Sequence, residues 1–78
     1  MITCEKLEKT FNAKVSELAN SKQKQDFCLD TMLLINNLRA NVQSQEDEVA
    51  FKALYSFIQN VRANAQTATY AKTWGLAI

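Results

Sequence analysis

The sequence predicts an all-α fold, either a three-helix bundle or a long helical hairpin with an N-terminal helix. The 78-residue chain contains no proline and a single glycine, Gly75, so its interior lacks helix breakers. Apolar residues make up 47% of the chain and recur at spacings of three and four. The length accommodates a single domain, residues 1–78. Because so short a chain builds only a small core, we expect a homo-oligomer, most simply a two-fold dimer.

The first helix is expected over residues 3–20. Thr3 is a suitable N-cap, and Glu5 places a negative charge in the first turn, where it favours the helix dipole. One apolar stripe runs along this helix, formed by Cys4, Leu7, Phe11, Val15 and Leu18. Such a helix buries one face and exposes the other.

The second helix is expected over residues 22–43, with Ser21 as its cap. Between residues 27 and 35 its apolar side chains cover nearly the whole circumference, and they are Phe27, Cys28, Leu29, Met32, Leu33, Leu34 and Ile35. A helix that is apolar all round is buried on more than one side. We therefore expect this helix in the middle of the bundle or at the seam of an oligomer.

The third helix is expected over residues 45–73. Ser44 is its predicted N-cap, with Asp47 completing a sequence close to a capping box, and Gly75 suits the left-handed position after the last turn. Two interpretations of its end stay open. A continuous helix would overhang the others and expose a partner or self-association surface, whereas a bend near Thr67 would fold the tail onto the core. The tail residues concerned are Tyr70, Trp74, Leu76 and Ile78.

A ten-residue segment occurs twice. Residues 35–44 align with residues 58–67 at an offset of 23, with six identities, and Arg39 aligns with Arg62. Either both helices solve one packing problem and the arginine face is solvated, or the carboxamides form a polar seam that fixes register between helices or subunits. A third interpretation is an anion-binding site, because arginine forks suit phosphate. Its residues would be Arg39, Arg62, Asn36, Gln43, Gln59 and Gln66.

Residue types that carry common chemistry are scarce. The chain has no histidine, no glycine-rich phosphate loop and only two cysteines, Cys4 and Cys28, which are 24 residues apart. We therefore expect no enzyme, no metal and no cofactor. We interpret the cysteines as reduced, buried thiols of a cytosolic protein rather than a disulfide.

Charge and hydropathy limit the partners further. A net charge of +1 gives no general attraction to nucleic acid or acidic lipid. The first residues do not resemble a signal peptide, and no apolar run is long enough to span a membrane, so we expect a cytoplasmic location and no membrane partner.

These expectations favour a non-catalytic, small cytosolic protein-interaction module. It would act as a regulator, inhibitor or assembly adaptor that presents a helical apolar face to a larger protein. The alternative is a ligand-binding protein that sequesters a nucleotide-like anion, or a nucleic-acid backbone, through Arg39 and Arg62.

Overall fold

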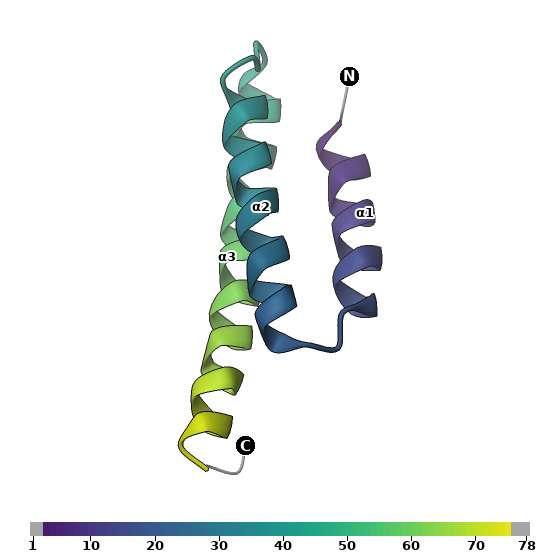
Figure 1. Ribbon diagram of the computed structural model, residues 1–78. Coiled ribbons are helices and arrows are strands. Elements are labelled where there is room, and N and C mark those ends of the chain that lie inside the picture. Colours follow the sequence, from purple (N-terminus) through teal and green to yellow (C-terminus); the bar gives the residue numbers. More distant parts are fainter. Residues whose placement is uncertain (1–2, 76–78) are drawn as a thin grey trace.

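The computed structural model, which describes residues 3–75, confirms the all-α prediction (Figure 1). Its helices are α1 (Cys4–Glu17), α2 (Ser21–Arg39) and α3 (Gln45–Thr73). Helices α2 and α3 form a long antiparallel hairpin, and α1 lies beside it, running in the same direction as α3 (Figure 1). The molecule is elongated and measures 47 × 19 × 16 Å.

Each helix begins at a side-chain cap. The Thr3 hydroxyl accepts a hydrogen bond from the Lys6 amide at 3.2 Å, as predicted, and Ser44 accepts one from the Asp47 amide at 3.5 Å. The prediction of Ser21 as the cap of α2 was wrong. Asn20 occupies that position, because its carboxamide oxygen accepts from the Lys22 amide at 2.8 Å and from the next amide at 3.2 Å.

Two of the three helices end earlier than predicted. Helix α1 stops at Glu17, where Leu18 turns to an extended conformation, instead of reaching residue 20. Helix α2 stops at Arg39 instead of residue 43, and a turn over residues 40–44 leads into α3. Short apolar side chains with polar neighbours continue the helical pattern through both turns, so the pattern alone does not mark where the chain must reverse.

Helix α3 has the predicted bounds and is continuous, so the alternative of a bend near Thr67 was wrong. Its threonines are accommodated because their hydroxyls donate to carbonyls four residues earlier: Thr67 to Ala63 at 3.0 Å and Thr69 to Ala65 at 3.1 Å. Gly75 follows with φ of 69°, the left-handed conformation expected after the helix end.

The core lies along the seam between α2 and α3, and α1 closes one side of it. Phe11 of α1 stacks on Phe27 with ring centroids 5.4 Å apart and meets Phe57 edge-on at 6.4 Å. The buried core side chains are Leu7, Phe11, Cys28, Met32, Ile35, Phe51, Leu54 and Ile58.

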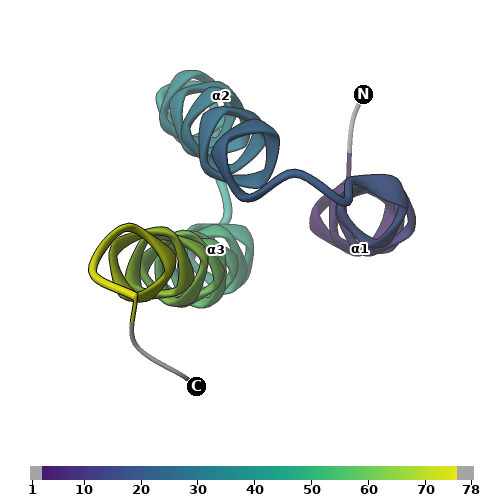
Figure 2. The same cartoon turned by 60° about the horizontal axis from the view of Figure 1, so that its bottom comes forward.

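Helix α2 is not the middle of a bundle within this chain. Viewed nearly end-on, the three helices occupy three corners and none is surrounded (Figure 2). Leu29 and Leu33 of α2 therefore remain 42% and 54% exposed. Between residues 3 and 75, no helix combines the length and the apolar character needed to cross a membrane.

Candidate functional site

The two cysteines are free, and their surroundings suppress reactivity. Burial raises the pKa of the Cys28 thiol, although the positive charge of Arg62 opposes that shift. Burial likewise raises the pKa of Cys4, which is half-buried rather than buried as predicted. A thiol with a raised pKa stays protonated near neutral pH and is a weak nucleophile. In the described part of the chain no three potential ligands among His, Cys, Asp and Glu gather as a metal site would require.

The first arginine of the repeat is engaged in an ion pair. The Arg39 guanidinium donates through Nε, at 2.9 Å, and through a terminal nitrogen to one carboxylate oxygen of Glu48 in the first turn of α3. This hydrogen bonding raises the pKa of Arg39 and lowers the pKa of Glu48. The pair ties the end of α2 to the start of α3, so Arg39 has a structural partner already.

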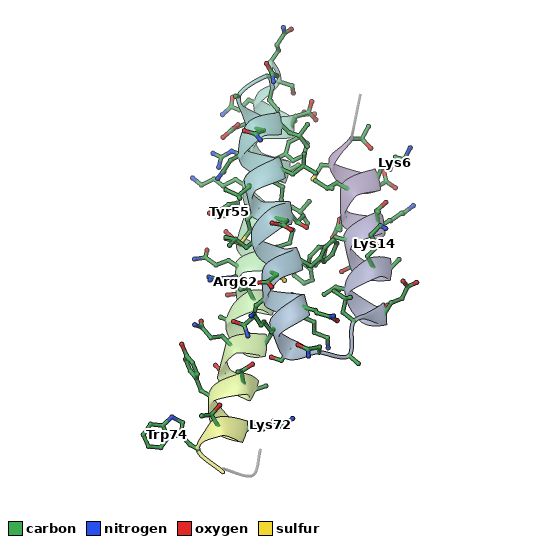
Figure 3. All side chains as sticks on the ribbon, in the orientation of Figure 1. Lys6, Lys14, Tyr55, Arg62, Lys72 and Trp74 are labelled. Atoms are coloured by element: carbon green, nitrogen blue, oxygen red, sulfur yellow. The ribbon has the colours of Figure 1, made fainter. Side chains whose placement is uncertain are left out.

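The second arginine has a different environment. Arg62 is half-buried on α3 beside Cys28, and its Nε is buried without a hydrogen-bond partner among residues 3–75. Together with Tyr55 it projects from the side of the hairpin that faces away from α1 (Figure 3). A buried N–H group without a hydrogen-bond partner costs free energy, and an acceptor that reached it would remove that cost.

The structure does not bring the two arginines together. Arg39 bonds to Glu48 at the start of α3, and Arg62 lies fourteen residues further along that helix, so the two arginines are roughly 21 Å apart along its axis. Gln43, another residue predicted for the anion-binding site, lies in the turn after α2 and not on the helix. One small anion therefore cannot be held by the whole predicted set.

The carboxamides of the repeat do not form a seam between helices of this chain, so that part of the prediction was wrong. Five of them are exposed on the outer faces of their helices, namely Asn36, Asn37, Gln59, Asn60 and Asn64. Asn41 is exposed in the turn after α2. Gln66 is half-buried and donates to the Tyr70 hydroxyl at 2.8 Å. The part of the prediction that concerns a seam between subunits stays a prediction.

A polar cluster that sequence reasoning missed joins the start of α2 to α3. The Ser21 hydroxyl donates to the Ala65 carbonyl at 2.6 Å and is hydrogen-bonded to the Thr69 hydroxyl. Gln25 adds a bond from its Nε2 to the same Thr69 oxygen at 3.1 Å. The available signal was that Thr69 follows Ala65 by four residues, on the stripe that faces α2. This cluster joins the two helices at the level where α2 begins, and Ala71, two residues further along α3, is still buried.

Beyond that level the end of α3 overhangs the hairpin and exposes two aromatic side chains. Tyr70 is 57% exposed, and Trp74 is 79% exposed and projects outward at the end of the helix (Figure 3). Leu76 and Ile78, the other two residues predicted for this surface, lie outside the described residues.

A shallow hollow lies beside the overhang, where the turn from α1 to α2 meets the side of α3. Its lining contains two lysines, Lys22 and Lys72, and no acidic residue among those described. Small and hydroxyl side chains form the rest: Ala19, Asn20, Ser21, Ala68, Thr69 and Thr73. The overhang thus combines exposed aromatic surface with a neighbouring basic depression.

Comparisons with known proteins identify no relative. No protein-family model, curated protein or solved structure matches the chain.

Proposed function

We propose that this chain is a non-catalytic protein-interaction module whose contact surface for a larger protein is the overhanging end of α3. The observation that carries the proposal is the exposure of Tyr70 and Trp74 on a regular helix beyond the support of α2. Aromatic side chains of this size dominate the binding energy of protein interfaces and are seldom left in water without a use.

The total surface supports an interaction role. The chain exposes 5812 Å², whereas a folded monomer of 8.8 kDa is expected to expose about 4,800 Å². The excess of about 1,000 Å² is comparable to the ~800 Å² that each partner contributes to a standard interface. A chain this small that keeps so much area open is suited to binding rather than to enclosing a substrate.

The chemistry of the overhang defines the partner. Trp74 and Tyr70 suit an apolar groove, and Lys22 and Lys72 suit carboxylates at its rim. We therefore expect a protein with an apolar cleft bordered by acidic side chains, and an affinity that weakens with salt.

The test compares the intact chain with the Tyr70→Ala/Trp74→Ala double variant, both immobilised through the N-terminal side. A protein captured from the source extract counts as a partner only if the double variant fails to capture it and the control variant still does. The control is Val49→Ala, which alters a 60% exposed side chain near the other end of α3. Because Trp74 is the single tryptophan, purified partner is then titrated against its fluorescence, which should shift to shorter wavelength on burial. The double variant should bind at least about tenfold more weakly.

Two results would contradict the proposal. In one, every captured protein is retained equally by the wild type and the double variant. In the other, the tryptophan emission of Trp74 stays unchanged at saturation with the partner.

The second candidate function, sequestration of a nucleotide-like anion, now depends on Arg62 alone. Its buried Nε has no hydrogen-bond partner among the described residues, whereas Arg39 is occupied by Glu48. Calorimetric titration with a nucleoside triphosphate would test it. Binding that Arg62→Ala abolishes and Arg39→Ala preserves would support this function, and no measurable heat with the wild type would remove it.

A further inference from the structure

The three most exposed large apolar side chains in the described part of the chain lie on one face of α3. They are Val49, near the start of the helix, and Tyr70 and Trp74 at its overhanging end. Trp74 follows Val49 by 25 residues, close to seven helical turns, so both project on the same side, roughly 37 Å apart along the axis. This side, which we call the α3 outer face, is opposite the buried side of α3 that holds Phe51 and Ile58.

Between its apolar ends the α3 outer face carries no charge. Five further exposed residues continue it at alternating steps of three and four: Ala53, Ser56, Asn60, Ala63 and Thr67. Charged residues make up 22% of the chain, and they do occupy the exposed sides of the other helices, for example Glu8 on α1 and Asp30 on α2. Depletion of charge together with aromatic side chains is the composition of an interface core rather than of a solvated face.

The two ends of the α3 outer face complement each other. At the start of α3 a hollow of about 390 Å³ lies beside Val49, and the other described residues that line it are Gln45 and Glu46. That volume is in the range of pockets that bury a small ligand, so it is enough for one aromatic ring. At the other end Trp74 projects outward (Figure 3). One chain cannot join the two ends, because a continuous helix separates them.

We propose that two copies of the chain associate through their α3 outer faces, with the two α3 helices antiparallel across a two-fold axis. With the axis midway between residues 49 and 74, Trp74 of each copy docks at Val49 of the other. This symmetry fills both hollows at once and leaves no aromatic end free to add a third copy. The inference rests on the overhang of the proposed function and gives it a second occupant, which a larger protein must displace.

The same register accounts for the residues between the ends. Tyr70 meets Ala53 of the second copy and Thr67 meets its Ser56, so each larger side chain faces a smaller one. Small side chains let the two helix axes approach to roughly 8–10 Å. Lys52, at the edge of the face, comes nearly level with the second copy's Tyr70, whose ring favours a positive charge.

The carboxamides of the repeat in α3 lie at the centre of this contact. Asn60 of one copy is nearly level with Asn64 of the other, so the two carboxamides can exchange a hydrogen bond on each side of the axis. A polar layer inside a seam fixes register at some cost in affinity. This is the seam between subunits that the repeat predicts.

The antiparallel direction follows from the positions of the hollow and of the charges. A parallel pair would set Trp74 against Trp74, leave both hollows unfilled and bring together the acidic first turns of the two α3 helices, which repel. The antiparallel pair instead places each acidic first turn near the end of the other α3, where the last turn carries Lys72.

The experiment follows molecular mass, by sedimentation equilibrium, and the emission of Trp74, the single tryptophan, over a dilution series from about 100 μM. At the top of the series the mass should approach twice the 8.8 kDa of the chain, and the emission should lie at shorter wavelength because the indole is buried. Val49→Asn should raise the dissociation constant at least about tenfold and remove the emission shift over the same range. Within one chain Val49 is too far from Trp74 to affect its emission, so only contact between copies links them.

The matched control is Leu33→Asn, which makes the same kind of change at an exposed side chain of α2, outside the α3 outer face. It should leave the dissociation constant unchanged. Because Val49 and Leu33 are both exposed, circular dichroism should show a helical content close to that of the wild type in both variants.

Direction is tested by charges at Ser56 and Thr67. In the antiparallel pair Ser56→Lys/Thr67→Glu sets opposite charges across each contact, whereas Ser56→Lys/Thr67→Lys sets like charges there. The second variant should therefore have a dissociation constant about tenfold higher than the first, and the difference should shrink in about 0.5 M salt. In a parallel pair each position faces itself, so like charges would meet in both variants and their constants would be similar.

Three outcomes would overturn the proposal. A mass of 8.8 kDa throughout the series refutes self-association. A dimer that Val49→Asn leaves unchanged refutes this face. Equal dissociation constants for the two charged variants refute the antiparallel direction.

The pairing and the proposed function fail separately. A chain that stays monomeric but captures a larger protein through Tyr70 and Trp74 removes only the pairing. A dimer whose overhang captures no protein removes only the proposed function. Val49→Ala weakens the pairing and leaves the overhang free, so it remains a control for capture.

Discussion

The α2–α3 hairpin and α1 are held in the molecule by different kinds of contact. The hairpin supplies six of the eight core side chains and is closed at both ends by polar bonds, Ser21 to Thr69 at one end and Arg39 to Glu48 at the other. Helix α1 supplies only Leu7 and Phe11, and among residues 3–75 no hydrogen bond or ion pair joins it to the hairpin.

The difference in contacts predicts that α1 is held less firmly than the two helices of the hairpin. Hydrogen bonds at two separate levels fix the register of α2 against α3. Helix α1 contacts the hairpin through apolar side chains, and such contacts fix its position along the hairpin less specifically. Regions with few buried contacts open at lower free energy than the core does. We therefore expect α1 to undock without unfolding the hairpin, and the following substitutions test that expectation.

The largest effect is expected from Ile58→Ala. Ile58 is fully buried between the helices of the hairpin, so removing its side chain leaves a cavity in the shared core. We expect the free energy of unfolding to fall by roughly 3 kcal/mol, measured by urea denaturation followed by circular dichroism. Ile58→Val, which removes one methylene, is the control and should cost about 1 kcal/mol. Equal effects of the two substitutions would contradict a tightly formed seam.

An intermediate effect is expected from Phe11→Ala, which removes the ring that stacks on Phe27 and meets Phe57. A buried Phe→Ala change costs about 3–5 kcal/mol in a continuous core, but here the loss is limited to the docking energy of α1, so we expect roughly 2 kcal/mol.

Hydrogen exchange locates this effect. Amides of Cys4–Glu17 should exchange much faster in Phe11→Ala, whereas those of α3 around Ile58 should keep most of their protection. Phe11→Leu should restore much of the difference. A uniform loss of protection in all three helices would show that α1 and the hairpin unfold as one unit.

The smallest effect is expected from Glu48→Gln, which breaks an ion pair at the surface of the hairpin. Because the bond to Arg39 lowers the pKa of Glu48 below its ordinary value of about 4.5, the pair stabilises the fold above that pH. Its contribution is lost as the pH falls through the lowered pKa.

The measurement is the difference in unfolding free energy between wild type and Glu48→Gln from about pH 7 down to pH 3. The wild type should be the more stable at neutral pH, and the difference should vanish in acid and in high salt. Glu46→Gln removes an exposed carboxylate from the same turn without touching the bond between Arg39 and Glu48, so it is the control for the loss of one negative charge. A constant difference at all pH values would exclude the ion pair as its cause.

The sequence predicted the helices better than their junctions. The apolar period and the caps Thr3 and Ser44 identified three helices, and the full length of α3 followed from its uninterrupted stripe. The stop of α2 at Arg39 was not predicted, because the helical pattern of apolar and polar residues continues through the turn that follows it. Asn20 and Ser21 are both good N-cap residues, so the sequence did not decide between them; in the structure Asn20 caps α2 and the Ser21 hydroxyl donates to the Ala65 carbonyl.

The candidate surfaces were predictable only in part. Tyr70 and Trp74 could be recognised because helix lengths alone imply an overhang, and the structure leaves both exposed. The open side of α2 could not, since a run of apolar residues around a helix does not tell which of them another helix of the same chain will cover. Leu29 and Leu33 became distinguishable from Met32 and Ile35 only when α1 and α3 were in place.

The order of the helices has a consequence for how the chain folds during synthesis. Helix α1, which ends at Glu17, leaves the ribosome before the other two helices. The ring of Phe57 packs against Phe11, but Phe57 is synthesised 40 residues after Glu17. At 5–20 residues per second, that delay is about 2–8 s. Helices α2 and α3 are joined by residues 40–44, so their contacts form locally and quickly once both exist. The first helix made is thus the last to dock, and for seconds Leu7 and Phe11 are available to chaperones or to a neighbouring nascent chain.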